Sequence, residues 1–391
     1  MNKSILHTPE GVRDIYNEEM EKREVILSKL NNLVKLYGFK MIDTPTFEYM
    51  SVFYTDITLK KPKDLYKFFD KEGNTLVLRP DFTPSIARAS SKYFTDDRAL
   101  RLSYFGNVFA NNRRYQGRLK ESCQFGGELI GDKSIDADAE IISIVYNAFK
   151  ACNLNSFMIS ISHADIIKEL IRLGGFDNEK ADIITTYISN RNIFDLEKYL
   201  KSENCDKKLI KLFSMLHHIY KPYSAKWNEL LEYAKDYDKL YDSLKYLDEL
   251  ATILKSYDII DNISFEPGSI SEFDYYTGII FAGYTEGIGD IVAAGGRYDT
   301  LLSNFGKDRP AIGFGIFVEE LEKALDNQNV NICPNEAKTV IIYDRAKREE
   351  AVNTAKKLRD DNKIAELILA NDDIDSIKAL YPNDISIMEI R

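Results

Sequence analysis

The sequence predicts an α+β protein with an antiparallel β-sheet flanked by helices, a helical insertion and a small α/β unit at the C-terminal end. Apolar, aromatic runs at Arg101–Phe109 and Ser122–Ile130 flank a basic segment, the pattern of two antiparallel strands joined by a long loop. From Asp165 to Tyr257 the chain is highly charged and has helical spacing. After a polar boundary at Asp326–Ala337, strand and helix patterns alternate again.

The first 100 residues are expected to supply flanking helices and short strands. Helical periodicity runs from Asn17 to Tyr37 and ends at Gly38, which can take the left-handed cap conformation. The segment Phe39–Tyr49 is strand-like but contains a proline. A short strand at Thr75–Leu78 leads into a turn, and a helix is expected at Ser85–Tyr93.

Two later elements follow from local pattern. Ser134 is a candidate N-cap for a helix over Ile135–Ala151. Alternation over Phe157–Ile161 predicts a half-buried strand. In the insertion, five apolar residues form one stripe along a helix: Leu240, Leu244, Leu247, Ala251 and Leu254. We interpret this stripe as the face of the helix that packs into the core, and a protein-docking surface is the alternative.

The last 130 residues return to strand patterns. A strand is expected at Ile263–Phe265, and a hairpin from Tyr275–Tyr284 and Asp290–Ala294. The sequence AAGGRYD at 293–299 is interpreted as a glycine-rich approach to a helix over Tyr298–Phe305. Further elements are strands at Ile312–Ile316, Thr339–Tyr343, Glu366–Ala370 and Ile385–Ile390, and helices ending at Leu325 and spanning Lys347–Asp361. The expected domains are therefore 1–326, with 165–257 inserted, and 338–391.

Composition excludes several classes of protein. The 391 residues are 44% hydrophobic and 29% charged, which favours a folded core. No apolar run approaches a membrane span and the start lacks a signal-peptide pattern, so a cytoplasmic location without membrane contact is expected. The net charge of −10 argues against extensive RNA contact. No cofactor is expected. No zinc site or disulfide framework is expected either, because the four cysteines are widely spaced and form no CxxC pair: Cys123, Cys152, Cys205 and Cys333.

Polar residues embedded in strand-like runs mark a candidate site. Asp81, Gln124 and Glu128 can all accept hydrogen bonds, so together they suit a small ligand that carries an ammonium group. On pattern alone, ordinary buried salt bridges to Arg79 or Arg297 are the more favoured interpretation. No P-loop, no GxGxxG and no nucleophile–base pair is found.

Several motifs, in order, resemble those of histidyl-tRNA synthetases over roughly residues 5–325. The resemblance implies a class II aminoacyl-tRNA synthetase fold, in which motif 1 carries a self-dimer interface. The matching segments are PEGVRD at 9–14, GFKMIDTPTFEY at 38–49 (motif 1), LRPDFT at 78–83, residues 101–131 (motif 2), SEFDYYTG, AAGGRYD and AIGFGIFVEEL at 311–321 (motif 3).

The chain departs from that family at three positions that the resemblance assigns to phosphate-binding arginines. Ala110, Ser271 and Glu320 stand there instead. Adenylate formation depends on positive charge where phosphate charge develops, and losing one such group commonly costs about a hundredfold. The resemblance therefore implies no catalytic residues, although Arg113, Arg114 and Arg118 remain in the motif 2 loop.

The amino-acid side of the implied pocket is largely kept. Asp81 replaces a glutamate, and Ala110 and Ser271 leave the histidine carboxylate fewer cationic partners. The histidine-binding residues implied by the resemblance are Asp81, Thr83, Gln124, Glu128, Tyr275 and Tyr276.

The C-terminal region, 338–391, is similar to part of the synthetase anticodon-binding domain, but only about 54 residues remain, so no tRNA is expected as a partner. The whole pattern is similar to the regulatory subunits of ATP phosphoribosyltransferase. That resemblance implies a hetero-octamer with the short-form catalytic subunit, activation of that subunit, and feedback inhibition with histidine as effector. A divergent active histidyl-tRNA synthetase and a free-standing histidine sensor are the alternatives.

Overall fold

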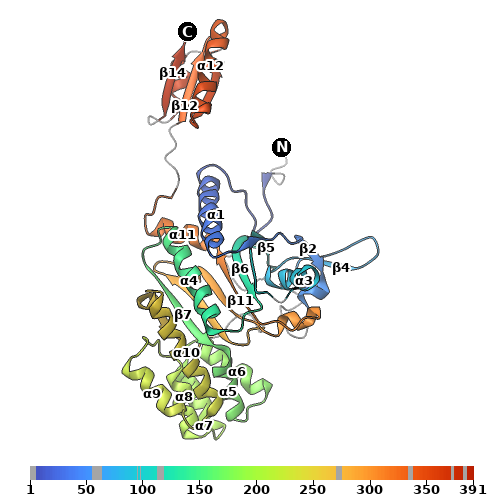
Figure 1. Ribbon diagram of the computed structural model, residues 1–391, viewed down its shortest axis with the longest axis vertical. Helices are drawn as coiled ribbons and strands as arrows, with labels where there is room; N and C mark the ends of the chain where they lie inside the picture. The colour runs from blue at the N-terminus through green and yellow to red at the C-terminus, as the bar shows by residue number, and fades with distance from the viewer. Residues whose placement is uncertain are drawn as a thin grey trace. The chain divides into compact units, whose positions relative to one another are not determined.

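The structure is a computed structural model that describes residues 6–54, 64–94, 96, 98–111, 119–269, 275–332, 338–370, 374–381 and 385–391 (Figure 1). The chain forms two compact units, Met1–Ile332 and Cys333–Arg391. The division between them lies inside the polar segment Asp326–Ala337.

An eight-stranded sheet forms the body of the first unit, with strand order β1-β5-β6-β11-β10-β9-β7-β8. The inner pairs are antiparallel, as the sequence predicts, but the edge strands β1 and β8 run parallel to their neighbours, so the sheet is mixed. The strands are β1 (Lys40–Met41), β5 (Leu100–Phe109), β6 (Glu121–Ile130), β7 (Phe157–His163), β8 (Ile263–Phe265), β9 (Ile279–Thr285), β10 (Ala293–Arg297) and β11 (Ala311–Phe317).

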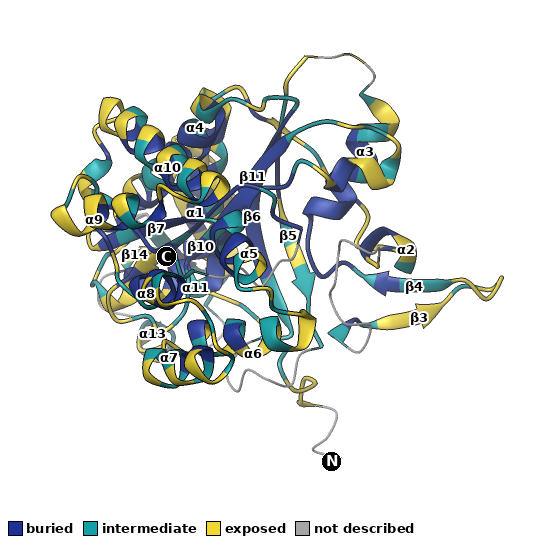
Figure 2. Ribbon diagram, turned by 90° about the horizontal axis from the view of Figure 1, so that it is seen from below, coloured by how far each residue is buried: buried dark blue, intermediate teal, exposed yellow. Residues whose placement is uncertain are grey.

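Helices cover both faces of this sheet. On one face, α1 (Glu18–Leu36) and α4 (Ile135–Ala151) bury apolar residues against Phe125 and Leu129 of β6. On the other face, α3 (Thr83–Tyr93) and a 3-10 segment (Leu301–Phe305) pack around Tyr104 of β5. The central strands are accordingly buried on both sides (Figure 2). The cap expected of Ser134 is confirmed, because its side chain accepts a hydrogen bond from the Ala137 amide.

A second, three-stranded antiparallel sheet contains β2 (Phe47–Tyr49), β4 (Thr75–Leu78) and β3 (Lys67–Phe69), in that order, beside the short helix α2 (Met50–Phe53). The strand-like run Phe39–Tyr49 is thus split between two sheets. The break falls at a proline, which cannot donate to a strand ladder.

The insertion is helical, as predicted, and consists of α5 (Ala164–Leu173), α6 (Asn178–Ser189), α7 (Ile193–Ser202), α8 (Lys207–Met215), α9 (Ala225–Ala234) and α10 (Asp238–Ser256). The apolar stripe of α10 is fully buried, so it is a core face and not a docking surface: Leu240, Leu244, Leu247, Ala251 and Leu254.

Three local predictions need correction. β7 is buried on both faces, because Ser160 and Ser162 are shielded and hydrogen-bond to Glu266 and to the carbonyl of Pro267. Residues 293–297 are the strand β10 itself, and only the 3-10 turn Leu301–Phe305 follows it. Tyr275 and Tyr276 precede β9 and do not lie on it.

The second unit is a small α/β fold. Its parallel sheet has the order β13-β12-β14. Ile341 packs against Ala351 and Ala355 to form its core. The elements are β12 (Lys338–Tyr343), α12 (Arg348–Asp360), β13 (Ile364–Leu369), α13 (Ile374–Lys378) and β14 (Ser386–Ile390). Across the described residues of both units, no helix is long and apolar enough to cross a membrane.

Candidate amino-acid-binding site

The floor of the candidate site is the face of the large sheet opposite α1 and α4. Along β6, Gln124 and Glu128 point to this face because they are four residues apart in a strand. The neighbouring strand β11 places Gly313 directly opposite Glu128. A Cβ at Gly313 would lie 1.6 Å from Oε2 of Glu128, and a Cβ at Gly315 would lie 2.3 Å from Nε2 of Gln124. Because the two glycines have no side chains, the side chains of Glu128 and Gln124 can occupy this space.

The turn between β4 and α3 brings two more polar residues onto this floor. The Thr83 hydroxyl donates a hydrogen bond to Oε1 of Glu128 at 2.8 Å. The Asp81 carboxylate accepts a hydrogen bond from the Tyr275 hydroxyl at 3.1 Å. The Tyr276 ring lies beside that of Tyr275, with centroids 4.9 Å apart.

The structure thus brings the six predicted histidine-binding residues together, although they come from three separate parts of the chain. Each is less than a tenth exposed: Asp81, Thr83, Gln124, Glu128, Tyr275 and Tyr276. Their role in binding histidine stays a prediction.

The two carboxylates do not form the salt bridges that pattern alone favoured. Arg79 donates to the carbonyl oxygens of Asn107 at 2.8 Å and Thr44 at 2.7 Å. Arg297 is paired with Asp138, away from this face. Among the described residues, Asp81 and Glu128 accept hydrogen bonds from hydroxyl groups and a backbone amide, not from a cation.

Burial has a strong electrostatic effect on this cluster. Desolvation raises the pKa of Glu128 to about 8, even though hydrogen bonds from Tyr298 and Thr83 favour the charged form. The nearby charge of Asp81 acts in the same direction as burial and contributes to this raised pKa. A ligand cation placed between the carboxylates would offset both effects, so the arrangement suits an ammonium group.

Sequence reasoning missed two tyrosines of the site. The Tyr298 hydroxyl donates to Oε2 of Glu128. Tyr104 stacks on Phe82 at 4.4 Å and accepts a 3.4 Å hydrogen bond from Gln124. Tyr298 could have been predicted as a site residue, because it lies in the AAGGRYD motif. Tyr104 could not, because only the pairing of the strands shows that it lies at the site.

Two of the three positions assigned to lost arginines, Ala110 and Glu320, lie outside this cluster. The Ala110 amide donates to the carbonyl oxygen of Lys120 at 2.9 Å. Glu320 forms an ion pair with Lys323 at 2.7 Å on the surface of α11 (Val318–Asn327). Ser271 and the loop arginines Arg113, Arg114 and Arg118 fall outside the described residues.

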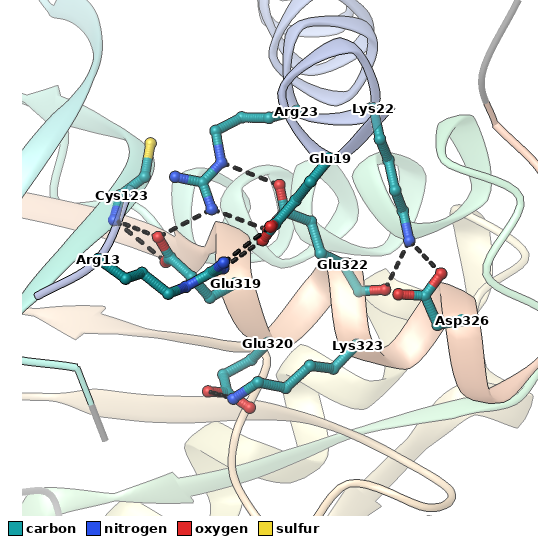
Figure 3. A network of polar contacts seen from close by, with 10 residues as sticks. All are labelled: Arg13, Glu19, Lys22, Arg23, Cys123, Glu319, Glu320, Glu322, Lys323 and Asp326. Carbon is teal, nitrogen blue, oxygen red and sulfur yellow. Dashed lines mark hydrogen bonds and ion pairs between the residues drawn. The ribbon is translucent and has the colours of Figure 1, made fainter. Parts of the chain in front are cut away.

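The residue before Glu320 has a different, structural role (Figure 3). Both carboxylate oxygens of Glu319 accept a hydrogen bond from the Cys123 amide, at 2.9 and 3.0 Å. Arg23 of α1 lies 3.0 Å from Glu319 and 2.8 Å from Glu322. This buried network fixes α1 and α11 to β6 one residue before Gln124. Within the described ranges, no cluster of three or more potential ligand side chains could hold a metal ion.

Comparisons with known proteins agree with this architecture. The family described as histidyl-tRNA synthetase matches residues 11–321. An ATP phosphoribosyltransferase regulatory subunit from Caldanaerobacter subterraneus subsp. tengcongensis is 34% identical over 365 residues, 93% of this chain and 94% of the relative. The regulatory subunit from Clostridium novyi is 35% identical over 387 residues, 97% of this chain and 90% of the relative.

Solved structures show the same fold. A Bacillus halodurans protein described as an ATP phosphoribosyltransferase regulatory subunit/histidyl-tRNA synthetase has a TM-score of 0.83 at 28% identity, and 98% of each chain is covered. A histidyl-tRNA synthetase from Nostoc sp. PCC 7120 has a TM-score of 0.77 at 16% identity, covering 96% of this chain and 88% of that one, which shows the fold alone. With its class II synthetase-like fold and these relatives, the chain belongs to the family of ATP phosphoribosyltransferase regulatory subunits.

Proposed function

We propose that this chain is a non-catalytic regulatory subunit acting in the first step of histidine biosynthesis. It activates the short-form ATP phosphoribosyltransferase catalytic subunit within a hetero-octamer and makes that subunit sensitive to histidine. Family membership supports the kind of partner. The buried site supports the identity of the effector.

The observation that carries the proposal is the pair of buried carboxylates, Asp81 and Glu128, on a glycine-lined floor. Their described partners are neutral groups, so bound histidine would bring the cation, its α-ammonium group. Gln124, Tyr275 and Tyr276 form polar and aromatic walls for the rest of the amino acid. Two carboxylates around one ammonium make charge-assisted hydrogen bonds, which are roughly twice as strong as neutral ones.

Feedback requires that histidine bind one state of the assembly more tightly than another. A differential affinity of about 1–3 kcal/mol is typical of such coupling. Histidine in this site then shifts the assembly toward a less active arrangement, without taking part in chemistry itself.

A binding experiment on the complex with the catalytic subunit tests this proposal. Isothermal titration calorimetry is expected to show saturable histidine binding that Asp81→Asn weakens at least about tenfold, because a charge-assisted contact is lost. Asp43→Asn is the matched control, because its side chain is 92% exposed and lies outside the site. Absence of histidine binding in a complex that still shows normal feedback inhibition would contradict the proposal.

The absence of adenylation is tested separately. With alanine, serine and glutamate at positions 110, 271 and 320, the three positions that the resemblance assigns to phosphate-binding arginines carry no cation. Histidine-dependent exchange of pyrophosphate into ATP should therefore stay at background, with a histidyl-tRNA synthetase as positive control. Clear exchange would support an active synthetase instead.

The chain is also proposed to self-associate through the motif 1 region. One face of the three-stranded sheet exposes aromatic side chains: Phe47 is 52% exposed, Tyr49 55% and Phe68 37%. Phe47 and Phe68 contact each other edge to face at 5.6 Å. A second copy of the chain would cover this face, in keeping with the dimer interface that motif 1 carries in synthetases.

A further inference from the structure

The helical insertion contacts the candidate site by two routes, although its own residues do not belong to the site. One route begins at Tyr246 of α10 and the other at Lys168 of α5. Helix α10 packs along α4, and α5 begins directly at the end of β7 (Figure 1).

The first route is a chain of hydrogen bonds through two buried side chains, those of Asp138 and Arg297. The Tyr246 hydroxyl donates to Oδ2 of Asp138 at 2.6 Å, and Nε of Arg297 donates to Oδ1 of the same carboxylate at 2.9 Å. The Asp138 side chain is fully buried. Arg297 ends β10, and the next residue, Tyr298, donates to Glu128 in the site.

Arg297 is held so firmly that it can transmit a displacement. Its guanidinium also donates to the carbonyl oxygens of Asp132 at 3.0 Å and Ser134 at 3.3 Å. Its aliphatic stem crosses the bare backbone of Gly278, where a Cβ would lie 3.1 Å from Cδ. Close-packed interiors transmit strain instead of absorbing it, so a shift of Asp138 would reach Tyr298.

The second route reaches the site from α5. Nζ of Lys168 donates to the carbonyl oxygen of Tyr276 at 3.1 Å. The Ala164 amide, at the start of the same helix, donates to the carbonyl oxygen of Gly278 at 2.9 Å. Helix α5 thereby fixes the segment that carries Tyr275 and Tyr276.

We infer that the position of the helical insertion sets the histidine affinity of the site, with Tyr246 and Lys168 as positioning residues that act through Tyr298 and Tyr276. This inference rests on the proposed function. Both routes end at aromatic residues that contact or flank the carboxylates, so a movement of α5 and α10 changes the geometry of the site. By linkage, histidine binding would in turn bias the position of the insertion.

Calorimetric titration of histidine into the complex of the full chain with its catalytic subunit tests the inference. Tyr246→Phe removes one hydroxyl and Lys168→Met one ammonium, and each is expected to weaken histidine binding by about five- to fiftyfold. Tyr241→Phe makes the same change as Tyr246→Phe on the same helix, outside both routes, and should bind like the unmodified chain. Lys168 is exposed at the surface, so its substitution tests the idea even if Tyr246→Phe folds poorly.

Thermal unfolding separates positioning from simple stability. A purely structural role would lower the melting temperature equally with and without histidine, whereas positioning reduces the rise that histidine produces. If Tyr246→Phe and Lys168→Met bound histidine as tightly as the unmodified chain, this inference would be overturned but the proposed function would not. An unmodified complex that does not bind histidine would overturn the proposed function together with the inference.

Discussion

Gly313 of β11 lies directly opposite Glu128 of β6, and a Cβ at residue 313 would fall 1.6 Å from Oε2 of that carboxylate. The buried acid of the candidate site is therefore accommodated by the absence of a side chain on the neighbouring strand. Glu128 is 1% exposed and hydrogen-bonds to Thr83 and Tyr298, so moving its carboxylate would break these two hydrogen bonds.

Gly313→Ala should disable the site while leaving the fold intact. The added methyl group must displace the Glu128 carboxylate from its hydroxyl partners. Overpacking of this kind typically destabilises a protein by about 1–3 kcal/mol. Denaturant unfolding should show that loss, and calorimetry should show that histidine binding is lost or greatly weakened.

Gly289→Ala is the matched control, because a Cβ there would meet no atom within 4 Å. It should leave both stability and binding close to the values of the unmodified chain. Unchanged histidine binding by Gly313→Ala would contradict the placement of Glu128 in the ligand site.

The raised pKa of Glu128 predicts a pH dependence of the unliganded protein. Burial moves this pKa from an ordinary value of 4.5 to about 8. Between these values the folded chain keeps a proton that the unfolded chain has released, so the group's contribution to stability falls as pH rises from about 5 to 8. One such proton corresponds to about 1.4 kcal/mol per pH unit. Denaturant unfolding at several pH values should show this slope, and Glu128→Gln should remove it.

The same carboxylic acid predicts proton release on binding. An ammonium beside Glu128 lowers its pKa, so histidine binding near pH 7 should release a proton, and affinity should rise toward pH 8. Calorimetry in buffers of different ionisation enthalpy measures this proton directly. A Glu128→Gln complex that released as many protons as the unmodified one would rule out Glu128 as the source.

Arg23→Met should be among the most destabilising substitutions outside the site. Arg23 is 6% exposed and neutralises Glu319 and Glu322, which would be left as unpaired buried charges (Figure 3). Removing one partner of a buried ion pair commonly costs about 3–5 kcal/mol. Urea unfolding of the full chain measures the change.

Arg13→Met removes a comparable cation from an exposed ion pair with Glu19. Exposed pairs contribute about 0–1 kcal/mol, so this control should unfold close to the unmodified chain. If Arg13→Met and Arg23→Met lowered the free energy of unfolding equally, the buried network would not be what holds α1 and α11 in place.

Phe47→Asp should prevent self-association of the chain. The ring is 52% exposed on the aromatic face proposed as the dimer interface, and a buried carboxylate there would be costly. Sedimentation velocity should show a dimer for the unmodified chain and a monomer for this variant. Phe69→Asp is the control, because Phe69 points to the opposite face of the same strand from Phe68. A dimer that survives Phe47→Asp would exclude this face.

Periodic patterns predicted much of the fold. The spans Thr75–Leu78, Ile135–Ala151 and Ile263–Phe265 coincide with the observed elements, because each has a local signal of alternation, capping or apolar runs. Glycines misled the interpretation of 293–297, since glycine usually weakens a strand. Here Gly295 and Gly296 are needed because the rings of Phe281 and Tyr276 lie against the backbone of β10.

The sequence by itself determined the family and the α+β class and predicted the residue types of the candidate site, because motif order and periodicity are local properties of a chain. Only the tertiary structure decided what those residues contact. Strand pairing placed Gly313 beneath Glu128, brought Tyr298 to the same carboxylate and directed Arg297 to Asp138. Register across non-adjacent strands is fixed by packing of the whole sheet, and no local pattern in the chain encodes it.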